Sequence, residues 1–135
     1  MSTALFFITH EGIASSLITI AEKIVQKTNS NLSCLEVPMD ADINLMSEAI
    51  ENKLEQLDIK GGLLFITDVY GGTPSNIAQE AANKYHADLI SGVNLPMIIR
   101  LLNYRDETVK SLIQKALDGA RECIQHKISE TLPKT

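Results

Sequence analysis

The sequence predicts a single three-layer α/β domain, with helices on both faces of a mostly parallel sheet. Short apolar runs, each long enough for one buried strand, alternate along the 135 residues with segments whose apolar residues recur at helical spacing. Such alternation favours right-handed crossovers between parallel strands. The composition, 44% hydrophobic and 21% charged, is that of an ordinary globular domain. We expect a core over residues 2–128 and a tail over 129–135.

Three strands and two helices are expected in the first half of the chain. The runs ALFFIT (residues 4–9) and GLLFIT (62–67) are apolar throughout, as in strands covered on both faces. A further strand over residues 32–37 is stopped by Pro38. Amphipathic helices are expected over residues 13–27 and 42–57. Their apolar stripes are Ile13, Leu17, Ile20, Ala21 and Ile24 in the first helix, and Leu45, Ala49, Ile50 and Leu54 in the second.

The second half of the chain is mainly helical. A helix is expected to begin with Thr73 as its N-cap and Pro74 in its first position, and to run to about residue 85. Residues 122–128 either continue the last helix or form a fifth strand, and a polar tail begins at Ser129. The other expected elements are a strand over 88–93, a short helix from Pro96 to about residue 103, and a helix over 108–117 that stops at Gly119.

Charge and cysteine content restrict the classes of function. A net charge of −5 argues against nucleic acid as a partner. Cys34 and Cys123 lie far apart in apolar contexts, so we expect two small buried residues in a reducing compartment rather than a disulfide. The N-terminus lacks the features of a signal peptide, and no apolar stretch approaches the length of a membrane span. We therefore expect a cytoplasmic protein.

Polar residues that follow the first and third strands form the candidate site. In a sheet of order 2-1-3-4 these strands are neighbours where the order reverses, which is where open α/β sheets bind ligands. His10 and Asp68 would face each other there, and a carboxylate orients an imidazole and stabilises its protonated form. Gly71, Gly72 and Thr73 lead into a helix N-terminus, whose free N–H groups suit an anion such as a phosphoryl group.

Each of these features alone has an ordinary structural explanation. His10 is compatible with a turn position, Asp68 with a cap, and the glycines with a tight turn. Their convergence at the ends of adjacent strands favours a site, in which the histidine acts as acid, base or nucleophile. We expect no metal, because His86 and His126 lie on the surface and no ligand-like spacing is present. No cofactor-binding motif is present either.

Three segments resemble the EIIA proteins of the mannose family, which belong to the bacterial phosphoenolpyruvate-dependent phosphotransferase system. They are ITHEGIA (8–14), LLFITDVYGGTPSNIA (63–78) and SGVNLPMIIRLL (91–102). The resemblance rests on TH at the end of the first strand, D-x-x-G-G-[ST]-P after the third and G-V-N-x-P after the fourth. It extends from residue 4 to about residue 128, and the sequence is most similar to stand-alone EIIA-like proteins of proteobacteria.

The resemblance implies a flavodoxin-like fold and a phosphotransferase without a cofactor. His10 matches the family's phosphorylated histidine, which as a tele-phosphohistidine accepts phosphate from phospho-HPr and passes it to an EIIB partner. Asp68 matches the acid that orients and stabilises this imidazole. The residues that the resemblance brings near the phosphoryl group are Thr9, Gly71, Gly72 and Thr73.

The resemblance also implies a homodimer in which a C-terminal strand is exchanged antiparallel onto the partner's sheet, so that residues 122–128 form a strand. We expect no fused EIIB domain in 135 residues, and contact with the membrane only through a permease complex. Glu11 departs from the family, where a small residue commonly follows the active histidine. We expect its side chain to point to solvent or to a basic partner surface.

Two alternative functions are also compatible with the sequence. One is a phosphoryl-donor subunit for dihydroxyacetone kinase, and the other is a regulatory phosphoprotein without a role in transport. A receiver domain phosphorylated on aspartate shares the topology, but His10 stands where its acidic pair would be and no lysine follows the fourth strand.

Overall fold

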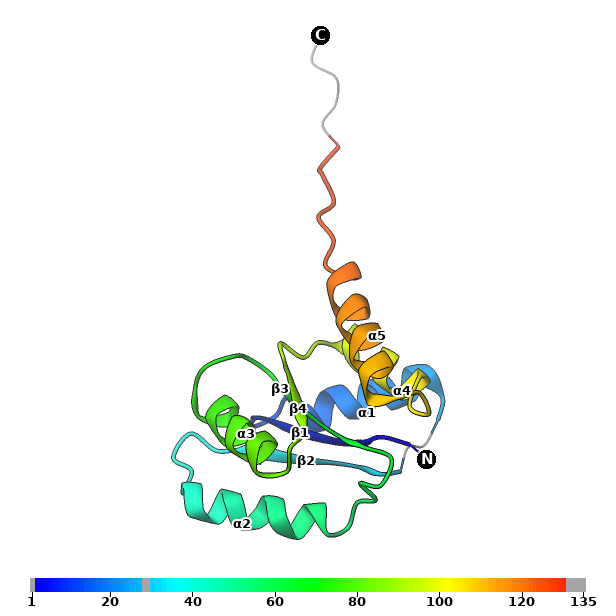
Figure 1. Ribbon diagram of the computed structural model, residues 1–135. Helices are drawn as coiled ribbons and strands as arrows, with labels where there is room; N and C mark the ends of the chain where they lie inside the picture. The colour runs from blue at the N-terminus through cyan, green and yellow to red at the C-terminus, as the bar shows by residue number, and fades with distance from the viewer. Residues whose placement is uncertain (1, 28–29, 131–135) are drawn as a thin grey trace.

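Four parallel strands form the centre of the molecule, in the order β2-β1-β3-β4 (Figure 1). The computed structural model describes residues 2–27 and 30–130. The expected sheet order and three-layer architecture are confirmed. The strands are β1 (Ala4–His10), β2 (Leu32–Val37), β3 (Leu63–Thr67) and β4 (Asp88–Ser91).

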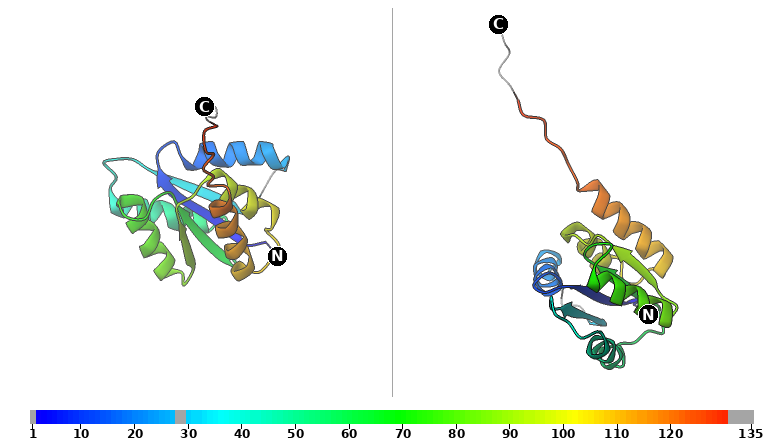
Figure 2. Two further views of the ribbon diagram at one scale, coloured as in Figure 1. Left: turned by 90° about the horizontal axis from the view of Figure 1, so that it is seen from above. Right: turned by 90° about the vertical axis from the view of Figure 1, so that its left-hand side faces the viewer.

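Helices cover both faces of this sheet (Figures 1 and 2). One face carries α1 (Ala14–Val25), α4 (Leu95–Asn103) and α5 (Val109–Glu122). The other carries α2 (Ile43–Leu54) and α3 (Thr73–Lys84). Among the described residues no helix combines the length and apolar composition needed to cross a bilayer.

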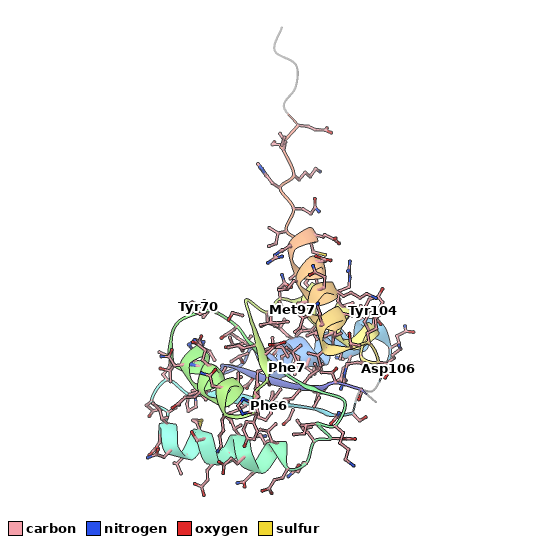
Figure 3. The ribbon with its side chains drawn as sticks, in the orientation of Figure 1. Phe6, Phe7, Tyr70, Met97, Tyr104 and Asp106 are labelled. Atoms are coloured by element: carbon pink, nitrogen blue, oxygen red, sulfur yellow. The ribbon has the colours of Figure 1, made fainter. Side chains whose placement is uncertain are left out.

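The central strand β1 is buried on both faces, which is why its sequence is apolar without alternation. Leu5 and Phe7 pack in the core beneath α1, α4 and α5, whereas Phe6 and Ile8 pack in the core beneath α2 and α3. Figure 3 shows Phe6 and Phe7 at the centre of the sheet. The rings of Phe6 and Phe65, with centroids 5.6 Å apart, link β1 to β3 within one core.

The buried faces of α1 and α2 differ from the predicted stripes. In α1 the buried residues are Ala14, Ile18 and Ala21, and of these only Ala21 belongs to the predicted stripe. Leu17 is partly buried against the core, whereas Ile20 and Ile24 are 45% and 52% exposed. The packed row lies one position further along the chain than the predicted one, and one residue is a rotation of about 100°. Ala14 and Ala21 face the sheet because small side chains allow close approach, and of the two alanines the prediction missed only Ala14. In α2, Leu45 is likewise exposed, and Ile50 and Leu54 are buried as expected.

Two glycines account for the differences at helix ends. The N-cap of α3 is Gly72, not Thr73, because the glycine adopts a φ of 90° that a threonine rarely adopts. The helix α5 does not stop at Gly119 but continues to its end at residue 122. A Cβ at Gly119 would lie 2.4 Å from Cγ of Arg100, so the glycine provides close packing between α5 and α4 rather than a helix stop.

Beyond α5 the chain extends away from the body of the molecule (Figures 1 and 2). Residues 124–130 form neither helix nor strand in this single chain and are exposed. The rest of the expected tail, residues 131–135, lies outside the described residues. Cys123, at the base of the extension, is exposed, so the expectation that both cysteines are buried is wrong for it; Cys34 is partly buried, and burial raises the pKa of its thiol.

The edge of the sheet opposite the carboxyl ends is held by one buried cation. Arg105 is 7% exposed, and its guanidinium donates hydrogen bonds to the carbonyl oxygens of Thr3 (2.8 Å), Ser30 (3.1 Å) and Asn31 (2.9 Å). These carbonyls precede β1 and β2, so the loop between α4 and α5 is tied to the start of two strands.

Replacing Arg105 with methionine should lower the free energy of unfolding by about 2–4 kcal/mol, because buried carbonyl groups lose their donors. Urea denaturation followed by circular dichroism measures the loss. Arg105→Lys, which keeps the charge but not the planar fork, should recover only part of it. An Arg105→Met protein as stable as the wild type would contradict this role.

Candidate functional site

His10 and Asp68 meet at the carboxyl edge of the sheet, where the strand order reverses. His10 is the last residue of β1, and Asp68 directly follows β3. Oδ2 of Asp68 lies 2.8 Å from Nδ1 of His10 and also accepts a hydrogen bond of 3.0 Å from the main-chain N–H of His10. The His10 side chain is 36% exposed and that of Asp68 only 9%, so the imidazole faces solvent on a buried support.

The Asp68 carboxylate is held in its charged form. Burial alone would raise its pKa, but the hydrogen bonds from the main chain and ring of His10 and from the main chain of Val69 outweigh burial, so the pKa lies below its ordinary value. Val69 donates to Oδ1 at 3.0 Å. An ionised Asp68 only accepts hydrogen bonds, so the proton between the two side chains belongs to Nδ1 of His10. In the neutral imidazole the Nε2 atom therefore carries the free lone pair.

Thr9 supports the turn after β1 rather than facing outward. Its side chain is fully buried, and its hydroxyl donates to the carbonyl oxygen of His10 at 2.8 Å and accepts from the N–H of Ala14 at 3.1 Å. The hydroxyl is therefore engaged with the main chain on both sides of the turn. These contacts fix the turn that carries His10, and the predicted place of Thr9 near a phosphoryl group stays a prediction.

Gly71, Gly72 and Thr73 lie in the loop at the same edge, between β3 and α3. Both glycines have a φ of 90°, with nothing within 4 Å of where a Cβ would stand, so they are required for conformation and not for close packing. The N-terminus of α3 has no side-chain cap, and Thr73 is exposed. Uncapped N–H groups at a helix N-terminus are suited to binding an anion.

Glu36, on β2, lies near the site but is not among the site residues that the sequence predicts. Its Oε2 accepts hydrogen bonds from the N–H (2.9 Å) and the hydroxyl (2.8 Å) of Ser15, and the N–H of Gly12 also contacts the carboxylate. The hydrogen bonds from Ser15 and Gly12 lower the pKa of Glu36 below its ordinary value. The sequence feature that could have indicated Glu36 is an acidic residue near the carboxyl end of the segment LSCLEV, which is otherwise rich in apolar residues.

Asn94 has a structural role at the start of α4, and the remaining polar residues considered in the sequence are exposed. Asn94, of the G-V-N-x-P motif, caps α4 by accepting from the N–H of Met97 at 3.0 Å, and it donates to the carbonyl oxygen of Ala120 at 3.1 Å. Glu11 is exposed, as expected. His86 and His126 are exposed too. Within residues 2–27 and 30–130 no cluster of three His, Cys, Asp or Glu side chains could hold a metal ion.

Fold and site together define a three-layer α/β domain with a partly exposed histidine, oriented by a carboxylate, at the switch point of its sheet. The family model EIIA-man, described as the PTS system fructose IIA component, matches residues 4–117. The chain belongs to this EIIA family of the phosphotransferase system, as the three sequence motifs implied.

Relatives and solved structures agree with this family. The PTS system mannose-specific EIIAB component of Escherichia coli K12 is 29% identical over 128 residues, which are 93% of this chain and 39% of that protein. The chain thus spans about two fifths of the length of this relative. The PTS system fructose-specific EIIA component of Bacillus subtilis is 32% identical over 85 residues, which are 62% of this chain and 58% of that protein.

Among solved structures, the mannose/sorbose specific IIA subunit from Enterococcus faecalis has the same fold, with a TM-score of 0.81 and 19% identity over 98% of this chain and all of that chain. A Klebsiella pneumoniae protein, provisionally described as a phosphoenolpyruvate-dependent sugar phosphotransferase system permease, has a TM-score of 0.75 and 29% identity. That alignment covers 93% of this chain and 91% of the Klebsiella chain.

The lowered pKa of Asp68 predicts a specific pH dependence of stability. A carboxyl group whose pKa is lower in the folded state stabilises the fold above its unfolded-state pKa, about 3.9, and this contribution is lost as the pH falls through the folded value. Asp68→Asn should therefore be less stable than the wild type at pH 7, and the difference should shrink below about pH 4. Urea unfolding at several pH values tests this, and a difference that is constant with pH would contradict it.

Proposed function

We propose that this protein carries a phosphoryl group on Nε2 of His10, as a tele-phosphohistidine, accepting it from phospho-HPr and passing it to an EIIB partner. The observation that carries the proposal is the 2.8 Å contact between Nδ1 of His10 and Asp68, which in the neutral imidazole leaves Nε2 as the free nucleophile on a partly exposed ring. Membership of the EIIA family supports the same chemistry. The alternatives with dihydroxyacetone kinase or a purely regulatory role are not favoured, because the relatives described above carry names of sugar phosphotransferase components.

The transfer needs no cofactor and no proton movement. The Nε2 lone pair attacks the phosphorus of the donor's phosphohistidine, the donor's P–N bond breaks, and its electron pair stays on the donor nitrogen. His10 keeps the proton on Nδ1 throughout, and the positive charge that develops on its ring lies against the Asp68 carboxylate. Catalysis then comes from positioning and fixed charge. Transfer to EIIB is the reverse of this step with a different acceptor.

The phosphoryl oxygens are proposed to bind at the start of α3. Gly71 and Gly72 expose main-chain N–H groups in a loop that other residues would strain, and Thr73 adds a hydroxyl donor. The positive end of the helix dipole favours an anion at this position. Thr9 contributes indirectly, by fixing the turn that carries His10.

We also propose a homodimer built through residues 122–128. The strand β4 lies at the end of the sheet order, so one of its edges is unpaired among the residues that the structure describes. In an extended strand, Ile124 and Ile128, which are 75% and 78% exposed, would lie on one face together with His126, and Gln125 and Lys127 would lie on the other. Antiparallel addition of this extension to β4 of a second copy would cover both features. The proposed donor and permease complex require a cytoplasmic location.

His10→Ala should take up no label from ³²P-phosphoenolpyruvate in the presence of enzyme I and HPr, because the acceptor nitrogen is gone. The matched control is His86→Asn, which removes an exposed histidine at a positive φ that asparagine tolerates; it should label normally. Label on the His10→Ala protein would overturn the proposed function.

Asp68→Asn should slow phosphoryl uptake by about 10- to 100-fold, the equivalent of one charge-assisted hydrogen bond of roughly 1.5–3 kcal/mol. Quenched-flow labelling with phospho-HPr measures the rate, and a near-ultraviolet circular dichroism spectrum establishes that the variant is folded. A rate equal to that of the wild type would refute the orienting role of Asp68.

The dimer proposal predicts that glutamate at both Ile124 and Ile128 converts the protein to a monomer at micromolar concentration, because charge would replace the buried face of the exchanged strand. Glutamate at Gln125 and Ser129, on the other face, is the matched control and should remain dimeric. Sedimentation equilibrium distinguishes the two states. A wild type that is monomeric at about 100 µM would contradict the proposal.

A further inference from the structure

A second carboxylate lies beside the turn that carries His10, and its task differs from that of Asp68. Glu36 is the partner of Thr9 in the parallel register of β1 and β2, so it stands one strand away, about 4.8 Å, from the residue before His10. Its carboxylate reaches across to the start of α1 and accepts from Ser15 at 2.9 and 2.8 Å and from the N–H of Gly12.

This contact gives the two helix N-termini near His10 opposite properties. The residue at the N-cap position of α1, Ile13, makes no side-chain cap, and the carboxylate of Glu36 binds the first turn in its place. The N-terminus of α3 has no side-chain cap at all. One helix end is thus filled by a negative charge of the protein itself, and the other is open to an anion.

We propose that Glu36 is a positioning residue that closes the N-terminus of α1 to the phosphoryl group on His10, directs that group to α3, and raises its tendency to leave. The inference rests on the proposed phosphorylation of His10. A fixed carboxylate near a phosphoryl group of charge close to −2 raises the free energy of the phosphorylated protein more than that of the unmodified protein. A carrier gains from this, because a group held less tightly passes more readily to the next acceptor.

The effect is electrostatic and therefore has a predictable size. Between a carboxylate and a dianion that lie near neighbouring strand ends and are solvated by water, Coulomb repulsion corresponds to about a three- to tenfold change in an equilibrium constant. Salt weakens such an interaction, because the Debye length falls to about 3 Å at 1 M.

The experiment measures the equilibrium partition of ³²P between HPr and this protein, at a limiting amount of label, for the wild type and three variants. Glu36→Gln keeps an acceptor oxygen for Ser15 but removes the charge. Ser15→Ala removes the hydroxyl contact but keeps the charge. Glu107→Gln is the matched control, because Glu107 also accepts from a serine hydroxyl, that of Ser111, at 2.5 Å, but lies next to the loop at the opposite edge of the sheet.

We expect Glu36→Gln to raise the equilibrium constant for phosphorylation by about three- to tenfold at low salt, with the increase diminishing in 1 M KCl. Ser15→Ala and Glu107→Gln should leave it unchanged. Should Glu36→Gln be too unstable to measure, Glu36→Ala tests the same charge and should shift the equilibrium in the same direction.

The possible failures are distinguishable. A wild type that takes up no label on His10 overturns the proposed function itself. A wild type that is phosphorylated, with an equilibrium constant that the loss of Glu36 leaves unchanged or lowers, overturns this inference alone. An equal shift in Ser15→Ala would assign the effect to the hydrogen bond rather than to the charge, and would overturn it as well.

Discussion

The contact between His10 and Asp68 depends on one constraint, the parallel register of β1 and β3. Ile8 pairs with Thr67, so the two strands end at the same edge and their next polar residues meet there. Because β1 is buried on both faces, a slip of one residue would exchange the side chains in the two cores, and the register is firmly specified. The positions of His10 and Asp68 are therefore fixed as firmly as those of the core residues in β1 and β3.

The turn after β1 is held by groups from three directions. Thr9 binds the main chain on both sides of the turn, Asp68 binds the N–H and the ring of His10, and Glu36 binds the first residues of α1. Few of these groups are free to move, so the imidazole is oriented before any partner arrives. Preorganisation of this kind is what a transfer step without cofactor or proton movement requires.

Three acidic residues near His10 differ in their burial and in their hydrogen-bond partners. Asp68 is largely buried and directly bonded to the ring, Glu36 is bonded to a helix start, and Glu11 is exposed. The sequence singled out Asp68 because it follows a strand adjacent to that of His10. It did not single out Glu36, because nothing in a linear pattern shows which helix start an acid on a neighbouring strand will reach.

By itself the sequence determined the fold class, because hydrophobic periodicity and the crossover rules leave few architectures open. The pairing of His10 with Asp68 followed from the expected strand order 2-1-3-4, which the structure confirms. Its three motifs also identified the family. Only the tertiary structure decided which face of α1 is buried, that Gly119 is a packing residue against Arg100, and that Glu36 fills the start of α1. Those features are contacts between segments far apart along the chain, and local patterns carry no information about them.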